Sequence, residues 1–297
     1  MPPFPSRLAA CLLGLAALSL ASVSLRADEP IEAVSSRVSS DYVRTKLPDG
    51  SFQPEGYAFG KGGYWSGPID DKSIGRMGFM EIAHTIAGPL AAQGYVPSRD
   101  PKATKLLIMV YWGTTYAPEH ASDSPLYNHL SDAIQAAFVS KQEHDPVQVT
   151  EQFEDAEMAA YAQVQKENHR RDVADGRNAS MLGYDSWWEA TFTAPAGTPL
   201  EQRKRDMMSE LEEDRYFVVL MAYDFQMMWK DKKRKLLWET RFSISEHRNE
   251  FDKQLPAMAL EASRFFGRDS HGLTHRDLPE GRVDVGEVRN LGTVPEK

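Results

Sequence analysis

The fold is decided by three consecutive stretches: RYFVVLMAYDFQMMW (Arg215–Trp229), KDKKRK (Lys230–Lys235) and LLWETRFSI (Leu236–Ile244). The first stretch is apolar on both alternating faces, which is typical of a strand that is covered on both sides at the centre of a sheet. The third alternates apolar and polar residues, as a strand with one buried face does. We therefore predict that residues 216–244 form two antiparallel strands, joined by a charged hairpin, in the middle of a buried sheet.

The two faces of the first predicted strand differ near its end. Asp224 interrupts one set of apolar residues, which indicates that this face reaches water close to the hairpin. A carboxylate bonded to the backbone at a strand end explains such a residue, and an acid used in hydrolysis is the alternative. The two opposed sets are Phe217, Val219, Met221, Tyr223, Phe225 and Met227 on one face, and Tyr216, Val218, Leu220 and Ala222 on the other.

The predicted hairpin loop, Lys230–Lys235, contains five cations and one anion. We interpret it first as a solvated loop whose charges oppose edge-to-edge aggregation of the sheet. The alternative interpretation is a small basic finger that contacts an anionic surface.

The N-terminus has the pattern of a secretory signal peptide. Arg7 precedes an apolar run from Leu8 to about Ala21, and small residues follow. Cleavage fits after Ala21, Ser24 or Ala27, and we favour Ala27 because the chain becomes polar at the next residue. The run is too short for a typical membrane span, so an uncleaved anchor is the second interpretation. We therefore expect an exported protein, periplasmic or extracellular, with no transmembrane segment in the mature chain.

The only cysteine is Cys11, which lies within the predicted leader. The segment Leu8–Cys11 imitates a lipoprotein cleavage box, but it precedes the apolar run, so we expect no lipid anchor. A mature chain without cysteine excludes disulfides, a thiol nucleophile and thiolate metal ligands.

The chain of 297 residues is acidic, with a formal net charge of -9. Without Arg7 and Arg26 of the leader, 32 cations face 43 anions. This balance argues against a general nucleic-acid-binding protein, because phosphate contacts require concentrated positive charge. The roughly 270 residues after the leader are enough for one large domain with an insertion.

The domain organisation follows from the remaining periodicities. We predict a signal peptide at 1–27, a single α+β domain at 28–278 and a polar tail at 279–297. A helical insertion at about 125–214 separates the strands, and it is our candidate for a partner surface. The sheet is mixed or antiparallel, with helices packed on it.

Individual elements have clear local signals. Apolar spacing and caps predict a helix from Ser73 to Gly94 and another from the Thr198-Pro199 cap to Asp214. We expect a flexible start at 28–36. Further predictions are strand pieces at 37–44 and 56–59, a central strand at 105–112, and helices at 150–170 and 255–266.

The segment GKGGYWSGPIDD (Gly60–Asp71) is rich in glycine but lacks the spacing and the closing Lys-Ser/Thr of a phosphate-binding loop. We interpret it as a structural loop with a tucked aromatic residue. The alternative is a ligand-stacking site that uses Trp65.

Two adjacent tryptophans, Trp187 and Trp188, lie in the segment ASMLGYDSWWEA (Ala179–Ala190). Neighbours on a regular element face different ways, so we expect one to be packed and the other to be available, for example for stacking on a sugar ring. Together with Trp65 and Asp224 they are our candidate ligand-binding residues.

Catalytic signatures are missing from the sequence. His271 and His275 have a spacing of four, but Gly272 lies between them and no HExxH glutamate accompanies them. Neither a GxSxG elbow nor an SxxK motif is present. We therefore assign no catalytic residue and no metal ligand, and we expect no cofactor, although carboxylate pairs for glycoside hydrolysis are always available among so many acids.

Four packing motifs resemble those of bacterial secreted or envelope α+β proteins of unknown function, which are often lipoproteins. The motifs are Gly56–Phe59, the helix that closes in Gln93–Tyr95, the strand KLLIMVYWG (Lys105–Gly113), and Leu237–Glu239 with the helix that follows. The chain departs from that pattern in its long helical middle and in lacking a usable anchor cysteine. The resemblance implies an α+β sheet-and-helix domain and no activity.

These observations give three hypotheses about function. The leading one is an exported, non-enzymatic protein that binds a protein or envelope partner through a sheet edge or the helical insertion. The second is a carbohydrate- or small-ligand-binding module that uses its exposed tryptophans, and the third is an acid-base hydrolase. The sequence leaves the ligand, the partner and the oligomeric state open.

Overall fold

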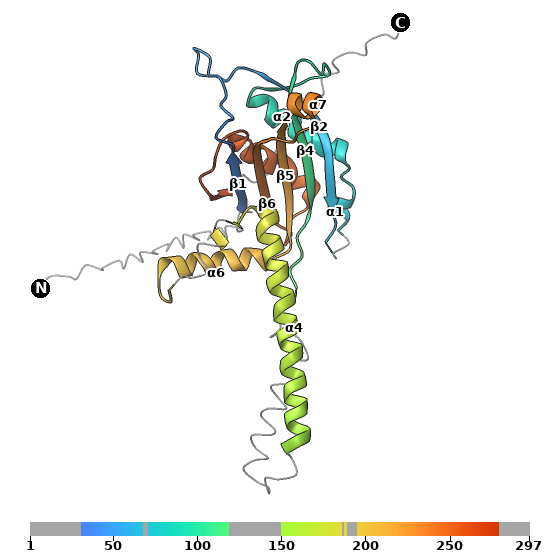
Figure 1. Ribbon diagram of the computed structural model, residues 1–297, viewed down its shortest axis with the longest axis vertical. Helices are drawn as coiled ribbons and strands as arrows, with labels where there is room; N and C mark the ends of the chain where they lie inside the picture. The colour runs from blue at the N-terminus through green and yellow to red at the C-terminus, as the bar shows by residue number, and fades with distance from the viewer. Residues whose placement is uncertain (1–30, 68–70, 119–149, 186, 189–194, 279–297) are drawn as a thin grey trace, which may run out of the picture.

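Seven strands form one mixed sheet in the computed structural model, which describes residues 31–67, 71–118, 150–185, 187–188 and 195–278 (Figure 1). The strand order is β3-β2-β4-β5-β6-β1-β7. β2 runs parallel to β3 and β4, and all other neighbours are antiparallel. The strands are β1 Ile31–Val38, β2 Glu55–Trp65, β3 Tyr95–Pro97, β4 Thr104–Thr114, β5 Arg215–Asp224, β6 Leu236–Ser245 and β7 Leu273–Asp277.

The centre of this sheet is β5, which pairs antiparallel with both β4 and β6. Val218 lies between Trp112 of β4 and Phe242 of β6 in the register. The strand therefore needs apolar residues on both of its faces, which is the pattern that its sequence has. The predicted α+β class is confirmed, with the strands of residues 216–244 at the centre of a mixed sheet.

One face of the sheet is covered by α1 (Lys72–Gly75), α2 (Phe79–Ala92) and α8 (Phe251–Ala262), which a 3₁₀ turn extends to Phe265. The main hydrophobic core lies beneath these helices. In this core the Trp238 ring stacks on that of Phe266, with centroids 6.0 Å apart. The buried strand residues on this face include Leu106, Ile108, Val110, Trp112, Tyr216, Val218, Leu220 and Ala222.

The predicted single helix from Ser73 to Gly94 is two helices instead. Asp71, not Ser73, caps α1, by accepting a hydrogen bond from the Ser73 amide at 2.7 Å. Residues 76–78 interrupt the helix, and α2 begins after Gly78 in extended conformation. The end of α2 is as predicted, because Gly94 follows it with a positive φ of 80° that favours glycine.

The other face of the sheet carries α4 (Thr150–Leu182) and α6 (Pro199–Leu211). Only the C-terminal part of α4 contacts the sheet, and the rest of this helix of about 50 Å projects away from the domain (Figure 1). Thr198 caps α6 as predicted, because its hydroxyl accepts from the Glu201 amide at 3.2 Å. The small second core beneath them consists of Ala33, Ala179, Leu182, Tyr184, Met207, Leu211, Phe217 and Val219.

The connection between β5 and β6 is not the predicted plain hairpin. The short helix α7 (Phe225–Asp231) follows β5, although its residues were predicted to extend the strand. The Asp224 carboxylate accepts from the Met227 amide at 2.9 Å and so starts this helix. The first four residues of α7, Phe225–Met228, include no β-branched residue, so the local sequence is compatible with a helix.

The predicted flexible start is wrong from residue 31 onward. β1 lies between β6 and the edge strand β7. The strand was not recognised in the sequence because its serines are polar. Ser35 donates to the Gly183 carbonyl and Ser36 to the Glu239 carbonyl, both at 3.0 Å, so these polar side chains are satisfied while buried.

β6 is covered on both faces, which corrects the prediction of one exposed face. Glu239 and Ser243, on the polar side, are buried. Glu239 pairs with Arg241, and Ser243 accepts from the Arg215 Nε at 3.3 Å. Polar residues therefore line this side because they bond one another, not because water reaches them.

The predicted signal peptide, the 125–149 part of the helical insertion and the polar tail lie outside the described residues. In the part of the chain that the structure describes, no helix combines the length and the apolar character that a membrane crossing requires.

Candidate functional site: a groove on the open face of the sheet

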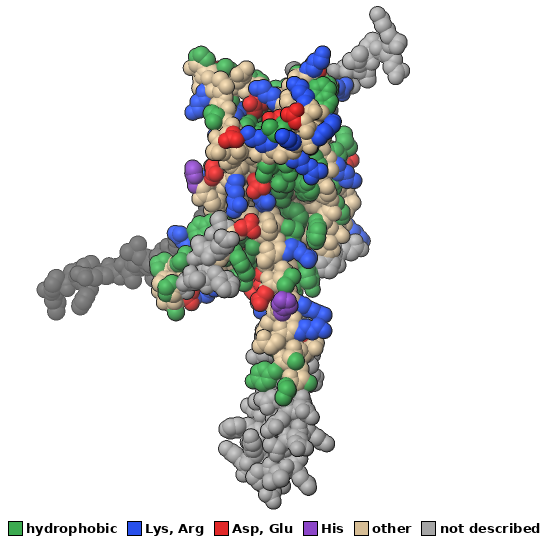
Figure 2. Space-filling model, in the orientation of Figure 1, with side chains coloured by type: hydrophobic (Ala, Val, Ile, Leu, Met, Phe, Trp, Pro, Cys, Tyr) green, Lys and Arg blue, Asp and Glu red, His purple; other side chains and the backbone are tan. Residues whose placement is uncertain are grey.

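A groove of about 500 Å³ lies on the face of the sheet that α4 and α6 cover only in part. We call it the open-face groove. Figure 2 shows hydrophobic side chains gathered on this face, beside the part of α4 that joins the domain. The groove is lined by Gly62, Gly63, Tyr64, Trp65, Tyr111, Arg177, Ser180, Met181, Phe217, Val219, Met221 and Arg241.

The floor of the groove is formed by the second apolar face of β5 and by its neighbour β4. Phe217 and Val219 are buried beneath α4, whereas Met221 and Tyr111 are only partly covered. These four side chains alternate with the residues of the main core, so one pair of strands supplies both surfaces. An apolar face that secondary structure leaves uncovered is unusual in a soluble domain and is a frequent feature of binding sites.

Two glycines of β2 explain why the groove is wide at this edge. The segment GKGGYW belongs to β2 and is not the predicted loop. A Cβ added to Gly62 would lie 2.6 Å from the Tyr111 ring, and one added to Gly60 would lie 2.3 Å from the Met109 sulfur. The side chains of β4 thus lie flat across the bare backbone of β2, and no side chain there fills the space above.

Trp65 forms one wall of the groove, as the last residue of β2. Its indole is about half exposed, and the Arg177 guanidinium of α4 lies 5.5 Å from the ring centroid. The pair joins the edge of the sheet to the helix by a cation–π contact. Ser180 and Met181 continue the wall along α4.

Cationic groups at two places give the groove a polar element. Arg177 is exposed and has no acidic partner among the described residues. Arg241 is paired with Glu239, but its Nε is buried and has no hydrogen-bond acceptor among the residues that the structure describes. A guanidinium recognises carboxylate, sulfonate and phosphate groups through paired N–H donors.

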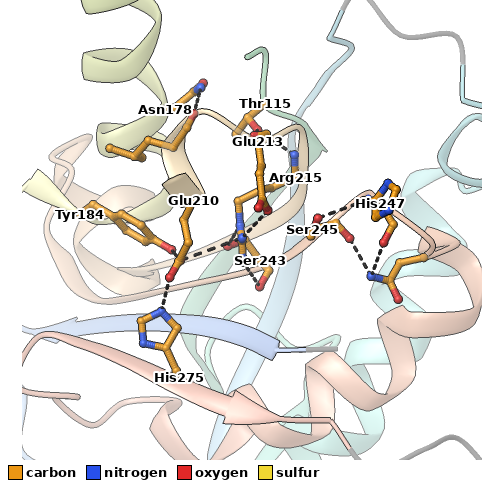
Figure 3. Close-up of polar contacts among 12 residues, drawn as sticks. Thr115, Asn178, Tyr184, Glu210, Glu213, Arg215, Ser243, Ser245, His247 and His275 are labelled. Atoms are coloured by element: carbon orange, nitrogen blue, oxygen red, sulfur yellow. Dashed lines mark hydrogen bonds and ion pairs between the residues drawn. The ribbon is translucent and has the colours of Figure 1, made fainter. Parts of the chain in front are cut away.

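A second polar group, the Glu210 cluster (Tyr184, Glu210, Arg215 and His275), lies at the end of the sheet where α4 and α6 meet it (Figure 3). The Tyr184 hydroxyl donates to Glu210, and the His275 Nε2 lies 2.7 Å from the other carboxylate oxygen. Arg215 approaches to 4.0 Å. The cluster thus joins Tyr184, which lies between α4 and α6, to Glu210 of α6 and to strands β5 and β7.

The electrostatics of this cluster follow from its burial. Burial alone would raise the pKa of Glu210, but the hydrogen bond from His275 and the charge of Arg215 outweigh it, and the pKa is lowered. Burial raises the pKa of the Tyr184 phenol well above its ordinary value, so this hydroxyl remains a donor. The arrangement stabilises a carboxylate between fixed donors. It lacks a nucleophile with an adjacent base, so its geometry supports a structural role.

A smaller cavity of about 220 Å³ borders the Glu210 cluster. Trp187 lines it, with the Arg203 guanidinium 5.7 Å from the indole, and Asp206 adds a carboxylate. Its charged lining combines the Arg203 guanidinium with the carboxylates of Asp206 and Glu210, so it presents no single chemistry to a ligand.

The structure does not bring the four candidate ligand-binding residues together. Trp65 lines the open-face groove on β2, and Trp187 lines the smaller cavity near β7, which is at the far edge of the strand order. Trp188 is half-buried against the second core. Asp224 caps α7. Only Trp65 therefore stands in the groove.

The residues that sequence reasoning missed are Tyr111, Arg177, Met181 and Arg241. Tyr111 could have been found from the strand KLLIMVYW, which is apolar on both faces although no helix was predicted to cover its second face. Arg177 and Met181 belong to the end of a helix that was predicted to stop near 170, and nothing local indicated its length.

Metal-binding groups do not assemble: no set of three histidine, cysteine, aspartate or glutamate side chains suits a metal ion in the described ranges. His275 contacts Glu210, and His271 lies outside β7 beside Asp269. No protein-family model matches the sequence, and a search of the curated proteins finds no match.

Proposed function

We propose that this chain is an exported, non-enzymatic binding protein of the bacterial envelope and that the open-face groove is its binding site. The observation that carries the proposal is the groove of about 500 Å³ over the apolar face of β5 and β4. Small-molecule sites have such volumes, apolar linings and few polar groups. Export rests on the N-terminal pattern at residues 1–27.

The ligand that fits the groove is an apolar molecule with one anionic group. Phe217, Met221 and Tyr111 offer hydrophobic and aromatic surface, where each buried methylene of a ligand contributes about 0.8 kcal/mol. Arg177 and Arg241 offer guanidinium donors to a carboxylate or a related anion. Acyl carboxylates and aromatic acids have this chemistry.

A sugar fits less well. Sugar rings need many hydrogen-bonding partners, and Arg177, Ser180 and Arg241 are the main polar side chains around the groove. Trp65 is the single tryptophan there, and Arg177 already lies over its ring. The carbohydrate alternative therefore has weaker support than the amphipathic anion.

A calorimetric titration of the full chain with decanoate tests the proposal, with neutral decanamide as the comparison. We expect saturable binding of decanoate at one site. Ser180→Trp places an indole in the groove from an exposed position of α4, so it should abolish binding without unfolding the protein. Gln165→Trp, exposed on the projecting part of the same helix, is the matched control and should bind normally.

The anionic preference has its own variant. Arg177→Ala should weaken decanoate binding about tenfold and leave decanamide unaffected, since a hydrogen bond to a charged group contributes about 1.5 kcal/mol or more. Absence of saturable binding by the wild-type chain, or equal binding by Ser180→Trp, would contradict the proposal.

A further inference from the structure

Three segments of the chain meet at the end of the sheet opposite the Glu210 cluster, and we call this region the basic end. They are residues 39–55, 98–105 and 224–235. Lys235 Nζ lies 2.9 Å from the Asp41 carboxylate, which joins the first segment to the third. The Gln226 amide donates to the carbonyls of Pro101 and Thr104, both at 2.7 Å, which joins the third to the second.

The basic end carries an excess of positive charge in an acidic protein. Ten cations and six anions lie in its three segments, whereas the whole chain has a net charge of -9. Figure 2 shows Lys and Arg side chains around the end of the domain that carries α7. The cations are Arg44, Lys46, Arg99, Lys102, Lys105, Lys230, Lys232, Lys233, Arg234 and Lys235, and the anions are Asp41, Asp49, Glu55, Asp100, Asp224 and Asp231.

Ion pairs within the basic end neutralise only part of its positive charge. Asp41 holds Lys235, Glu55 accepts from Tyr42 and lies 3.7 Å from Lys105, and Asp224 caps α7. Among the exposed cations, Lys230, Lys233 and Arg234 form no ion pair with any residue that the structure describes. They are free to meet an external anion.

Exposed apolar side chains accompany these cations. Val43 is 82% exposed and Leu47 37%, both in the connection between β1 and β2, and Trp229 of α7 is 43% exposed. Trp229 immediately precedes the cationic run Lys230–Lys235. Isolated apolar residues among lysines are characteristic of surfaces that enter the headgroup region of a membrane, where both parts find a partner.

We propose that the basic end docks on an anionic phospholipid surface. Except for Arg44, which is buried against the Phe52 and Tyr95 rings, the cations face the negatively charged headgroups. Trp229, Val43 and Leu47 enter the boundary between headgroups and acyl chains. A nucleic acid also attracts cations, but it offers no partner for Val43 and Leu47, and the negative net charge of the chain opposes long polyanions. The open-face groove takes no part in this contact, so the two proposals stand separately.

The test is sedimentation of the full chain with vesicles of 30% phosphatidylglycerol in phosphatidylcholine, compared with pure phosphatidylcholine vesicles. All variants share the apolar segment at residues 8–21. The readout is therefore the difference in affinity between anionic vesicles and pure phosphatidylcholine vesicles, which removes any contribution of that shared segment. The triple variant Lys230→Ser, Lys233→Ser, Arg234→Ser should lose on the order of 100-fold of this extra affinity, since each cation near the surface contributes about 1 kcal/mol. Trp229→Ser should lower affinity for the same vesicles about tenfold.

A control with the same change in charge keeps the test specific. Lys61→Ser, Lys166→Ser, Arg170→Ser removes three exposed cations elsewhere and should bind anionic vesicles like the wild type. Equal binding of the wild type to both kinds of vesicle would overturn the proposal. So would equal losses in the two triple variants, or binding of a 20-base-pair DNA duplex together with indifference to anionic vesicles.

Discussion

Both faces of β5 are largely apolar in sequence, but they differ in what covers them. Tyr216, Val218 and Leu220 are buried under α2 and α8. On the opposite face, Phe217 and Val219 lie under the end of α4, and Met221 is only partly covered. The first face holds the fold together, and the second leaves room for a ligand. Apolar character in a strand thus predicts a partner for each face, but the partner need not belong to the same chain.

The largest expected effect of this difference appears when two neighbouring side chains, one on each face, are truncated to alanine. Leu220→Ala removes a fully buried side chain of the main core and should lower the free energy of unfolding by about 2–5 kcal/mol, through lost burial and a cavity. Met221→Ala, on the open face, should lower it by about 1 kcal/mol or less. Urea denaturation measures both. Similar losses in the two variants would mean that the open face is as tightly packed as the core.

A second test concerns the glycines that keep the groove wide. Gly62→Ala places a methyl group 2.6 Å from the Tyr111 ring, so the ring must move, and overpacking of this kind costs about 1–3 kcal/mol. Gly63→Ala is the matched control, because a methyl group there would lie 3.8 Å from the Tyr111 ring, which is ordinary van der Waals contact. Thermal unfolding should separate the two variants. Unchanged stability of Gly62→Ala would show that Tyr111 does not rest on the β2 backbone.

A third test uses a carboxyl group at the edge of the covered face. Glu32 of β1 is fully buried, and neither carboxylate oxygen has a hydrogen-bond partner among the described residues. Burial and, secondarily, the charge of Glu261 raise its pKa well above the ordinary value. The unfolded chain therefore loses this proton at lower pH than the folded chain does.

The pH dependence of stability follows from that order. The contribution of Glu32 is fully present below its ordinary pKa and is lost as the pH rises toward the folded-state value. Glu32→Gln should raise the free energy of unfolding at neutral pH by on the order of 1 kcal/mol and remove this dependence. Urea denaturation across pH 4–8 is the measurement, and a variant less stable than wild type at pH 8 would refute the assignment.

The smallest expected effect belongs to the polar contacts that hold the second layer in place. The lowered pKa of Glu210 means that its contribution is present above the ordinary glutamate pKa and is lost as the pH falls through the folded-state value. Glu210→Gln should cost about 1 kcal/mol at neutral pH and have little effect at the acid end. Glu167→Gln, on the projecting part of α4, serves as a control. If the free energy of unfolding depended on pH in the same way for Glu210→Gln and for the wild type, a stabilising role of the Glu210 carboxylate would be excluded.

The sequence predicted the centre of the fold because its signals there are local. The two-faced alternation of β5, the strand at 104–114 and the Thr198-Pro199 cap each needed no knowledge of the rest of the chain. β1 escaped because Ser35 and Ser36 are satisfied only by Gly183 and Glu239, far away in sequence.

The candidate site was only partly predictable for a similar reason. Trp65 was recognised as an aromatic residue after glycines, but the role of those glycines depends on Tyr111 and Met109 of the next strand. Arg177 reaches the groove because α4 runs as far as Leu182. Asp224 stood out in an apolar strand, yet its function is to start α7.

If the open-face groove is a ligand site, a bound ligand can be located in it by crystallography. We would determine a crystal structure of the protein with 10-bromodecanoate and find the bromine by anomalous scattering. We expect a single strong bromine peak among Phe217, Met221 and Tyr111, with the carboxylate at Arg177 or Arg241. Bromine located only outside the groove, while the groove itself stays without ligand density, would contradict it.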